Sequence, residues 1–231
     1  MWVALLLSVI AVAYNNVVNR WDPFHSTAYV PVNLTFVGAI TILSASALEL
    51  SRTDLGLRGD LDAVVLALGI VAVFALGAFA LAGSRHAGRI ADKRVTDLRG
   101  AALAFYVCVR IPLGTALAEE VLFRGVLFAA WLEAGASTVL AAVWASMAFG
   151  LWHVTPTIIG IRMNDPQAGS YKLGAALITA VLLTTTAGLG LTWLRLETGG
   201  LVAPIVLHAG INSVGALAAV RAARARGDVG P

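Results

Sequence analysis

The chain contains little charge, and this scarcity decides its class. Only 13% of the 231 residues are Asp, Glu, Lys or Arg, whereas 59% are hydrophobic, and the mean hydropathy is +0.85. A soluble domain is nearer half apolar and a quarter charged. The composition therefore excludes an ordinary soluble domain and predicts an all-α, polytopic membrane helix bundle. The sequence shows no repeat and no low-complexity segment.

Cysteine and lysine are almost absent. The single cysteine, Cys108, excludes an intrachain disulfide. Lysine occurs twice against 14 arginines. We interpret these basic residues as topology signals, so no nucleic-acid partner is expected. The opening stretch MWVALLLSVIAVAY has no basic region and no cleavage site of a signal peptide, so we expect it to be a retained first span.

Several motifs of intramembrane proteolysis are also missing. The sequence has no HExxH, no GxSG serine site and no pair of intramembrane aspartates, and Cys108 has no histidine near it in sequence. These absences argue against the zincin, serine, aspartyl and cysteine routes to peptide hydrolysis.

Long apolar runs predict seven spans, since a span needs about 20 mostly apolar residues. The predicted spans are 2–19, 30–50, 62–83, 101–134, 137–159, 173–194 and 201–220. The fourth run is too long for one straight span, and Pro112 interrupts it. Because proline breaks or kinks a helix interior, we expect 101–111 to be a separate interfacial helix. The fold prediction is a bundle of about seven or eight transmembrane helices.

The basic residues orient these spans, because cytoplasmic loops are enriched in Lys and Arg. With loop 84–100 in the cytoplasm, eleven of the 16 basic residues lie on that side and three on the other. The eleven are Arg20, Arg85, Arg89, Lys93, Arg94, Arg99, Arg162, Lys172, Arg221, Arg224 and Arg226. This bias predicts an external N-terminus and a cytoplasmic C-terminus.

Two glutamates and an arginine stand within the fourth apolar run. Ionisable groups are costly in hydrocarbon and usually functional there. On a helix, Glu120 and Arg124 are four residues apart and share a face, which predicts an ion pair. Glu119 lies roughly 140° around the axis from Arg124. The spacing therefore leaves Glu119 to face another partner or a wet cavity.

Two more polar groups lie in later spans. His153 follows Phe149 by four residues, and we expect the phenyl ring to pack beside the imidazole. His208 and Asn212 share the same spacing and point one way from the seventh span. In the predicted topology, these residues and Glu119 all lie in the cytoplasmic half of the bilayer. We therefore expect them to meet in one intramembrane cavity.

A carboxylate, two imidazoles and an amide suffice for amide hydrolysis. The carboxylate can take a proton from water, an imidazole can assist, and the remaining donors can stabilise an oxyanion. The same groups could bind zinc, because His, His and Glu form a known catalytic ligand set. We expect no cofactor, with zinc as the open alternative.

These motifs resemble the CPBP intramembrane protease family, also called the CAAX protease and bacteriocin-processing or Abi family. Its pattern is EExxxR, then FxxxH, then HxxxN or HxxxD. Here the pattern stands as Glu119-Glu120-Val-Leu-Phe-Arg124, Phe149-Gly-Leu-Trp-His153 and His208-Ala-Gly-Ile-Asn212. The resemblance covers about residues 110–215. The family includes the eukaryotic endopeptidases that remove the last three residues of prenylated CAAX proteins.

The resemblance implies a role for each matched residue. Glu119 would be the catalytic base, assisted by His153. His208 and Asn212 would stabilise the oxyanion, and the mechanism would be metal-independent. The supporting residues would be Glu120, Arg124 and Phe149.

The resemblance and the composition together predict an intramembrane glutamic endopeptidase. We expect three spans and a basic loop in 1–100, the catalytic core in 101–220 and a basic tail in 221–231. The expected partners are the lipid bilayer and a protein or peptide substrate at the membrane. The expected location is a prokaryotic inner membrane, with the site facing the cytoplasmic leaflet. Two alternatives stay open: a non-catalytic immunity or scaffold protein, and a proton-coupled transporter.

Overall fold

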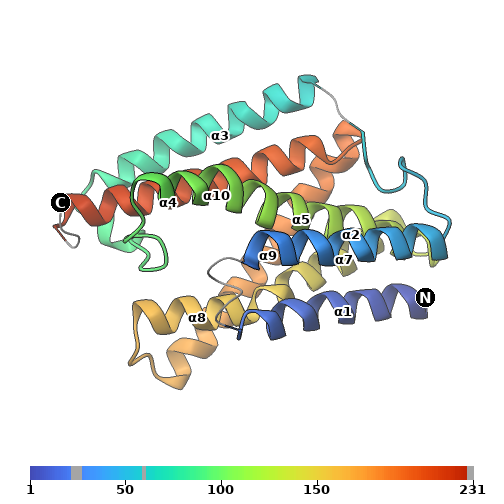
Figure 1. The fold of residues 1–231 in the computed structure, drawn as a ribbon, viewed down its shortest axis with the longest axis horizontal. Helices are drawn as coiled ribbons and strands as arrows, with labels where there is room; N and C mark the ends of the chain where they lie inside the picture. Colours follow the sequence, from blue (N-terminus) through green and yellow to red (C-terminus); the bar gives the residue numbers. More distant parts are fainter. Residues whose placement is uncertain (22–27, 59–60, 228–231) are drawn as a thin grey trace.

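The computed structural model describes residues 1–21, 28–58 and 61–227, and this part of the chain is helical without a strand (Figure 1). Six helices are long and apolar enough to cross a membrane, and Trp2–Val18 is a shorter apolar helix. Together they confirm the predicted bundle of about seven spans. Outward faces carry large exposed apolar side chains, such as Val73 and Leu76, which lipid tails can cover.

The helices follow the predicted spans within a few residues at most ends. They are α1 (Trp2–Val18), α2 (Tyr29–Ala47), α3 (Leu61–Ala82), η2 (Ala87–Arg89), α4 (Gly100–Phe105), η3 (Tyr106–Leu117), α5 (Ala118–Glu120), η4 (Val121–Leu127), α6 (Phe128–Glu133), α7 (Thr138–Trp152), α8 (Val154–Asn164), α9 (Ser170–Thr198) and α10 (Val202–Ala225). Segment η2 is a 3₁₀ turn, and η3 and η4 are π-helical. Helix α10 continues into the segment expected to be a basic tail.

The predicted break before Pro112 is wrong. Elements α4 to α6 form one helix from Gly100 to Glu133, 34 residues long, with Pro112 inside the π-helical segment η3. In a π-helix, the amide of residue 112 would donate to the carbonyl of Val107. Proline has no amide hydrogen, and the Ser213 hydroxyl of α10 donates to that carbonyl instead, at 2.9 Å. A side chain from another helix thus satisfies the group that proline leaves open.

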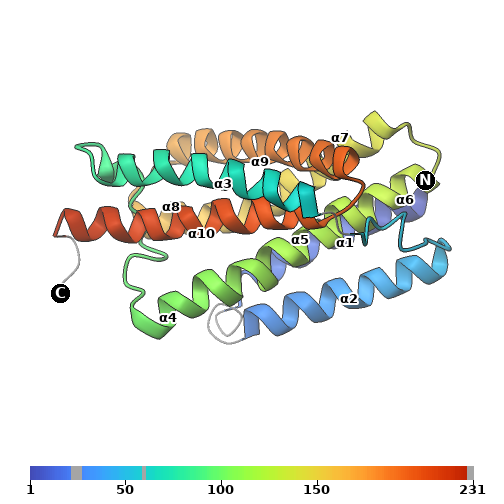
Figure 2. The same cartoon turned by 90° about the horizontal axis from the view of Figure 1, so that it is seen from above.

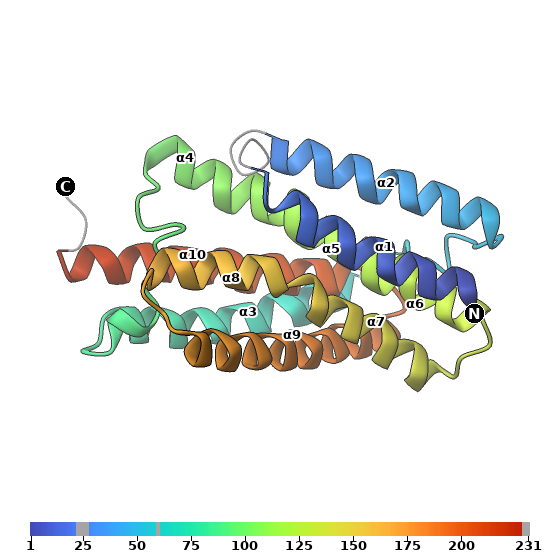
Figure 3. The same ribbon diagram turned by 90° about the horizontal axis from the view of Figure 1, so that it is seen from below.

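This long helix crosses the bundle diagonally between α2 and α10 (Figure 2). Helix α10 packs against both α3 and η3, while α7 packs against α9 and α1. Helices α1 and α2 lie along one flank, and α3 and α9 lie along the opposite one (Figure 3). The diagonal helix therefore brings its middle, α5, between the two flanks.

Consecutive spans run in opposite directions, so the loops gather at two ends of the bundle (Figure 1). The loop 83–99, the turn 165–169 and the end of α10 lie at one end, which carries most of the basic residues. The N-terminus, loop 48–58 and turn 134–137 lie at the other end. This arrangement matches the predicted alternation. That the basic end faces the cytoplasm stays a prediction from the positive-inside rule.

Candidate active site

Glu120 lies in a charge-paired network that engages its Oε1, while its Oε2 is buried without a hydrogen-bond partner in the described residues. It is fully buried, and its Oε1 accepts a hydrogen bond from Arg124 Nη1 at 2.8 Å. His208 Nδ1 of α10 lies 2.7 Å from the same oxygen. Arg124 is also buried, with its guanidinium 4.1 Å from the centre of the Phe149 ring. The predicted ion pair is therefore present, and it also fixes the histidine of a distant helix.

Glu119 has different surroundings, although it is only 4% exposed. Its Oε1 accepts a hydrogen bond from the indole nitrogen of Trp152 at 3.1 Å. Its Oε2 lies 3.8 Å from His208 Nε2, which is longer than a hydrogen bond. Within the described residues, this buried oxygen has no hydrogen-bond partner. Unsatisfied buried oxygens are rare and often belong to functional sites.

His153 stands at a break between α7 and α8. Its backbone has φ −85° and ψ 2°. Pro156 follows three residues later and has no amide hydrogen to donate to a carbonyl of the preceding helical turn. His153 Nδ1 lies 2.7 Å from the Phe149 carbonyl oxygen. Because a carbonyl only accepts, Nδ1 carries the proton, and Nε2 of a neutral ring is an acceptor. The Phe149 ring meets the imidazole edge-on at 4.7 Å, as predicted.

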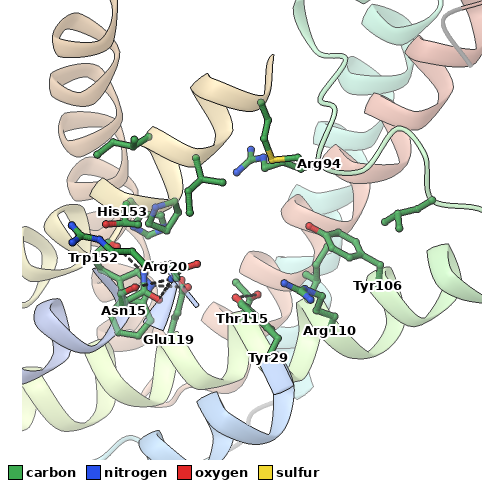
Figure 4. A pocket seen from close by; sticks show the side chains of 18 of the residues that line it. Asn15, Arg20, Tyr29, Arg94, Tyr106, Arg110, Thr115, Glu119, Trp152 and His153 are labelled. Carbon is green, nitrogen blue, oxygen red and sulfur yellow. Dashed lines mark hydrogen bonds between the residues drawn. The ribbon is translucent and has the colours of Figure 1, made fainter. Parts of the chain in front are cut away.

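Two cavities meet at His153. The first, of about 950 Å³, is lined by Glu119, Trp152 and His153 and extends past Arg94 and Arg110. Figure 4 shows Glu119, Asn15, Trp152 and His153 gathered at one side of this cavity, with Arg94 well away from them.

The second cavity, of about 840 Å³, is lined by His153, His208 and Asn212 and lies against α3 and α9. His153 and Thr115 line both cavities. The structure therefore brings together the residues of all three motifs.

Within the described residues, no group of three or more His, Cys, Asp or Glu side chains has the geometry to hold a metal ion.

Sequence reasoning missed three residues at this site. The structure places Asn15 and Asn16 in hydrogen bonds with the α7–α8 break, and Trp152 in a hydrogen bond with Glu119. The available signal was the adjacent pair of amides in an apolar helix, since polar side chains often join membrane helices.

Comparison with known proteins agrees with the motifs. Residues 101–214 match the family model described as type II CAAX prenyl endopeptidase Rce1-like, and this segment contains every candidate site residue. No curated protein and no solved structure gave a match. The match confirms the resemblance, supports protease activity in the membrane in general, and agrees with a multi-pass membrane protein. Residues 101–214 are therefore similar to the Rce1-like family of type II CAAX prenyl endopeptidases.

Proposed function

We propose that the chain is an intramembrane endopeptidase in which Glu119 activates the attacking water. The observation that carries this proposal is the division of labour between the two oxygens of Glu119. Trp152 holds Oε1, whereas Oε2 is buried without a hydrogen-bond partner in the described residues, and the Glu119 side chain lines the first cavity. A fixed carboxylate with one available oxygen is suited to take a proton from water.

His153, which lines the same cavity as Glu119, assists this step. Its Nδ1–H is held by the Phe149 carbonyl, so Nε2 is left as an acceptor. A neutral imidazole in this tautomer orients a water molecule by accepting one of its hydrogens. The water oxygen then faces the carbonyl carbon of a bound peptide.

His208 and Asn212 are the proposed oxyanion donors. His208 donates from Nδ1 to Glu120, so its Nε2 donates only when the ring is an imidazolium. Two buried carboxylates and one arginine leave one negative charge, and an imidazolium at His208 brings the sum to zero. Buried charges persist when they are paired. Asn212 lies one turn further along α10 and lines the second cavity with His208.

The proposed reaction conserves every proton. Glu119 removes a proton from water as the oxygen bonds to the carbonyl carbon, and the carbonyl electrons move onto the oxyanion held by His208 and Asn212. When the carbonyl re-forms, the carbon–nitrogen bond breaks. Glu119 returns its proton to the leaving nitrogen, which departs as an amine, and the new terminus forms as a carboxylic acid. Transfer of the acid proton to the amine gives the final products, a carboxylate and an ammonium.

The proposed substrate is a peptide or protein tail at the membrane. The first cavity extends toward the basic end of the bundle, where Arg94 lines it. With that end in the cytoplasm, the substrate enters from the cytoplasmic leaflet. We place the catalytic core in 101–220 and propose the plasma membrane of a prokaryote as its location.

Cleavage of a quenched fluorescent peptide library by the purified protein tests this function. We expect Glu119→Gln and His153→Ala to lower kcat/KM by about 10² to 10⁴-fold, the usual contribution of general acid–base groups. Thermal unfolding of each variant checks that the fold is intact. Activity after exhaustive chelation should equal that of untreated protein, which separates this mechanism from a zinc enzyme. Cleavage by Glu119→Gln at the wild-type rate would overturn the proposal.

A further inference from the structure

Helix α1 lies outside the family match, yet it contacts the helix break at His153 through two adjacent asparagines. Asn15 Nδ2 donates to the Trp152 carbonyl at 2.8 Å. Asn16 Nδ2 donates to the Leu151 carbonyl at 3.0 Å, and its Oδ1 accepts from the Thr155 amide at 2.8 Å. The Thr155 hydroxyl adds a fourth bond, to the Asn16 carbonyl at 3.2 Å.

These contacts replace the helical hydrogen bonds that the break removes. In an unbroken α-helix, the Thr155 amide would donate to the Leu151 carbonyl. The Asn16 amide group stands between those two atoms and satisfies both. Residue 156 would donate to the Trp152 carbonyl, but Pro156 has no amide hydrogen, and Asn15 supplies the donor. Helix α1 therefore holds the break in its observed geometry.

The break determines where two consecutive side chains point. Trp152 directs its indole N–H to Glu119 Oε1, while His153 faces the cavity (Figure 4). The indole is 3% exposed and meets the Phe123 ring edge-on at 5.3 Å. It also lies 6.0 Å from the ring of Tyr14, which belongs to α1. A donor that is fixed in this way prevents the carboxylate of Glu119 from exchanging its two oxygens.

We propose that α1 is part of the catalytic apparatus as a positioning element. Asn15 and Asn16 hold the α7–α8 break, and through it Trp152 presents Oε2 of Glu119 to water. This inference rests on the proposed function, because it assigns a task to residues that act on Glu119 and His153. Interhelical amide bonds that only joined helices would contribute to stability. Positioning residues also control the rate of the chemical step, since a misplacement of about 1 Å can lower it 10²-fold.

Trp152→Phe and Asn16→Leu test the proposal by activity. The first removes the indole N–H and keeps an aromatic ring, and the second keeps the side-chain shape and removes the bridging amide. We expect kcat to fall about 10- to 100-fold for each, with KM changed by less than about 2-fold, because substrate binding is left in place. Asn16→Gln should recover part of the lost kcat, because it restores the amide on a longer side chain.

Two matched controls separate positioning from general loosening of the bundle. Trp144→Phe makes the same change on α7 at a ring that is 45% exposed and stacks on Trp131. Ser8→Ala removes a different contact of α1, the acceptor for the Trp131 indole at 3.2 Å. Both controls should keep the wild-type kcat. If Trp152→Phe and Asn16→Leu also keep it while Glu119→Gln is inactive, the positioning proposal is wrong and the proposed function stands.

A measurement without substrate tests the contact itself. In ¹⁵N-tryptophan-labelled protein in micelles, the Trp152 indole resonance is assigned by its loss in Trp152→Phe. Replacing Glu119 by leucine should shift this resonance and leave the Trp144 resonance in place. Asn16→Leu should shift it as well, because the break no longer holds the ring. An unchanged Trp152 resonance in both variants would overturn the proposal, even if no peptide of the library is cleaved and the proposed function fails.

Discussion

The two adjacent buried carboxylates of the site, Glu119 and Glu120, have different surroundings. Around Glu120, Arg124 and His208 both compensate its charge at Oε1, and Phe149 covers the guanidinium, while Oε2 is buried without a hydrogen-bond partner in the described residues. Around Glu119, the one direct hydrogen bond within the described residues comes from the neutral indole of Trp152, and the side chain lines a cavity. The charge-paired Glu120 is suited to a structural role, and Glu119 is suited to react.

The energetics of the two carboxylates follow from this difference. A buried ion pair roughly offsets its own desolvation, but removing one partner leaves a charge buried alone. Within the described residues, the nearest charged partner of Glu119 is His208, whose Nε2 lies 3.8 Å from Oε2, so the charge of Glu119 is less closely compensated than that of Glu120. Chemical reactivity and structural stability are thus assigned to neighbouring residues on one helical turn.

Removing one member of the Glu120–Arg124 ion pair should have the largest effect on stability. We expect Glu120→Leu to lower the free energy of unfolding by about 3–5 kcal/mol, because Arg124 is then buried without a carboxylate. The double variant Glu120→Leu/Arg124→Leu should recover much of this loss. Glu119→Leu, in contrast, should destabilise the protein less, because the contact that it removes, at 3.8 Å from His208, is longer than a hydrogen bond. Equilibrium unfolding in detergent measures all three.

Equal destabilisation by Glu119→Leu and Glu120→Leu would contradict the comparison, because it would mean that both carboxylates are anchors. The double variant serves as the control for lost packing, since it leaves no charge unpaired. A double variant less stable than either single change would show that the pair contributes more than the charge it neutralises.

The next largest effects are expected at two adjacent residues of α10, Asn212 and Ser213, and they differ in kind. Asn212→Ala should lower kcat by about 10²–10³-fold, the usual loss of one oxyanion donor, and leave the fold intact. Ser213→Ala should do the reverse: activity is kept, and the free energy of unfolding falls by about 1–3 kcal/mol, because the Val107 carbonyl loses its donor. Steady-state cleavage and thermal unfolding of both variants check the pair. If Ser213→Ala lost activity and Asn212→Ala did not, the assignment would be wrong.

The sequence predicted contacts within a helix better than contacts between helices. The spacing of Glu120 and Arg124 was enough to predict their ion pair, because residues four apart share a helical face. The continuity of the helix through Pro112 could not be predicted. The Val107 carbonyl, which receives no hydrogen bond from Pro112, is satisfied by Ser213, about one hundred residues later in the chain. Asn15 and Asn16 were missed for the same reason: their partners lie far along the chain, in α7 and α8. Three motifs in order still predicted which helices meet.

A polar contact at the mouth of the cavities offers a surface counterpart to the buried pair. Asp92 Oδ2 in loop 83–99 lies 2.5 Å from Arg94 Nη2, and Asn164 at the end of α8 donates to Asp92 Oδ1 at 3.1 Å. Burial acts to raise the pKa of Asp92, but the hydrogen bonds and the charge of Arg94, together with Asn164, outweigh it and hold this pKa below the usual value of 3.8. The contact ties the basic loop to the helix that follows His153.

Replacing Asp92 should have the smallest effect. Asp92→Asn should lower the free energy of unfolding at pH 7 by less than about 1 kcal/mol, because Arg94 is largely exposed to solvent and screened. A carboxyl whose pKa is lowered by folding stabilises the native state above the unfolded pKa and loses that effect as the pH falls through the folded pKa. The difference in melting temperature between wild type and Asp92→Asn should therefore close as the pH falls below about 4. Asp165→Asn is the control. It removes an ion pair of the same length, 2.5 Å to Lys172, that joins only the end of α8 to the start of α9. A melting-temperature difference that persisted in acid would show that the side chain of Asp92 stabilises the protein through packing rather than charge. The surface contact and the buried Glu120–Arg124 pair would then differ in burial alone.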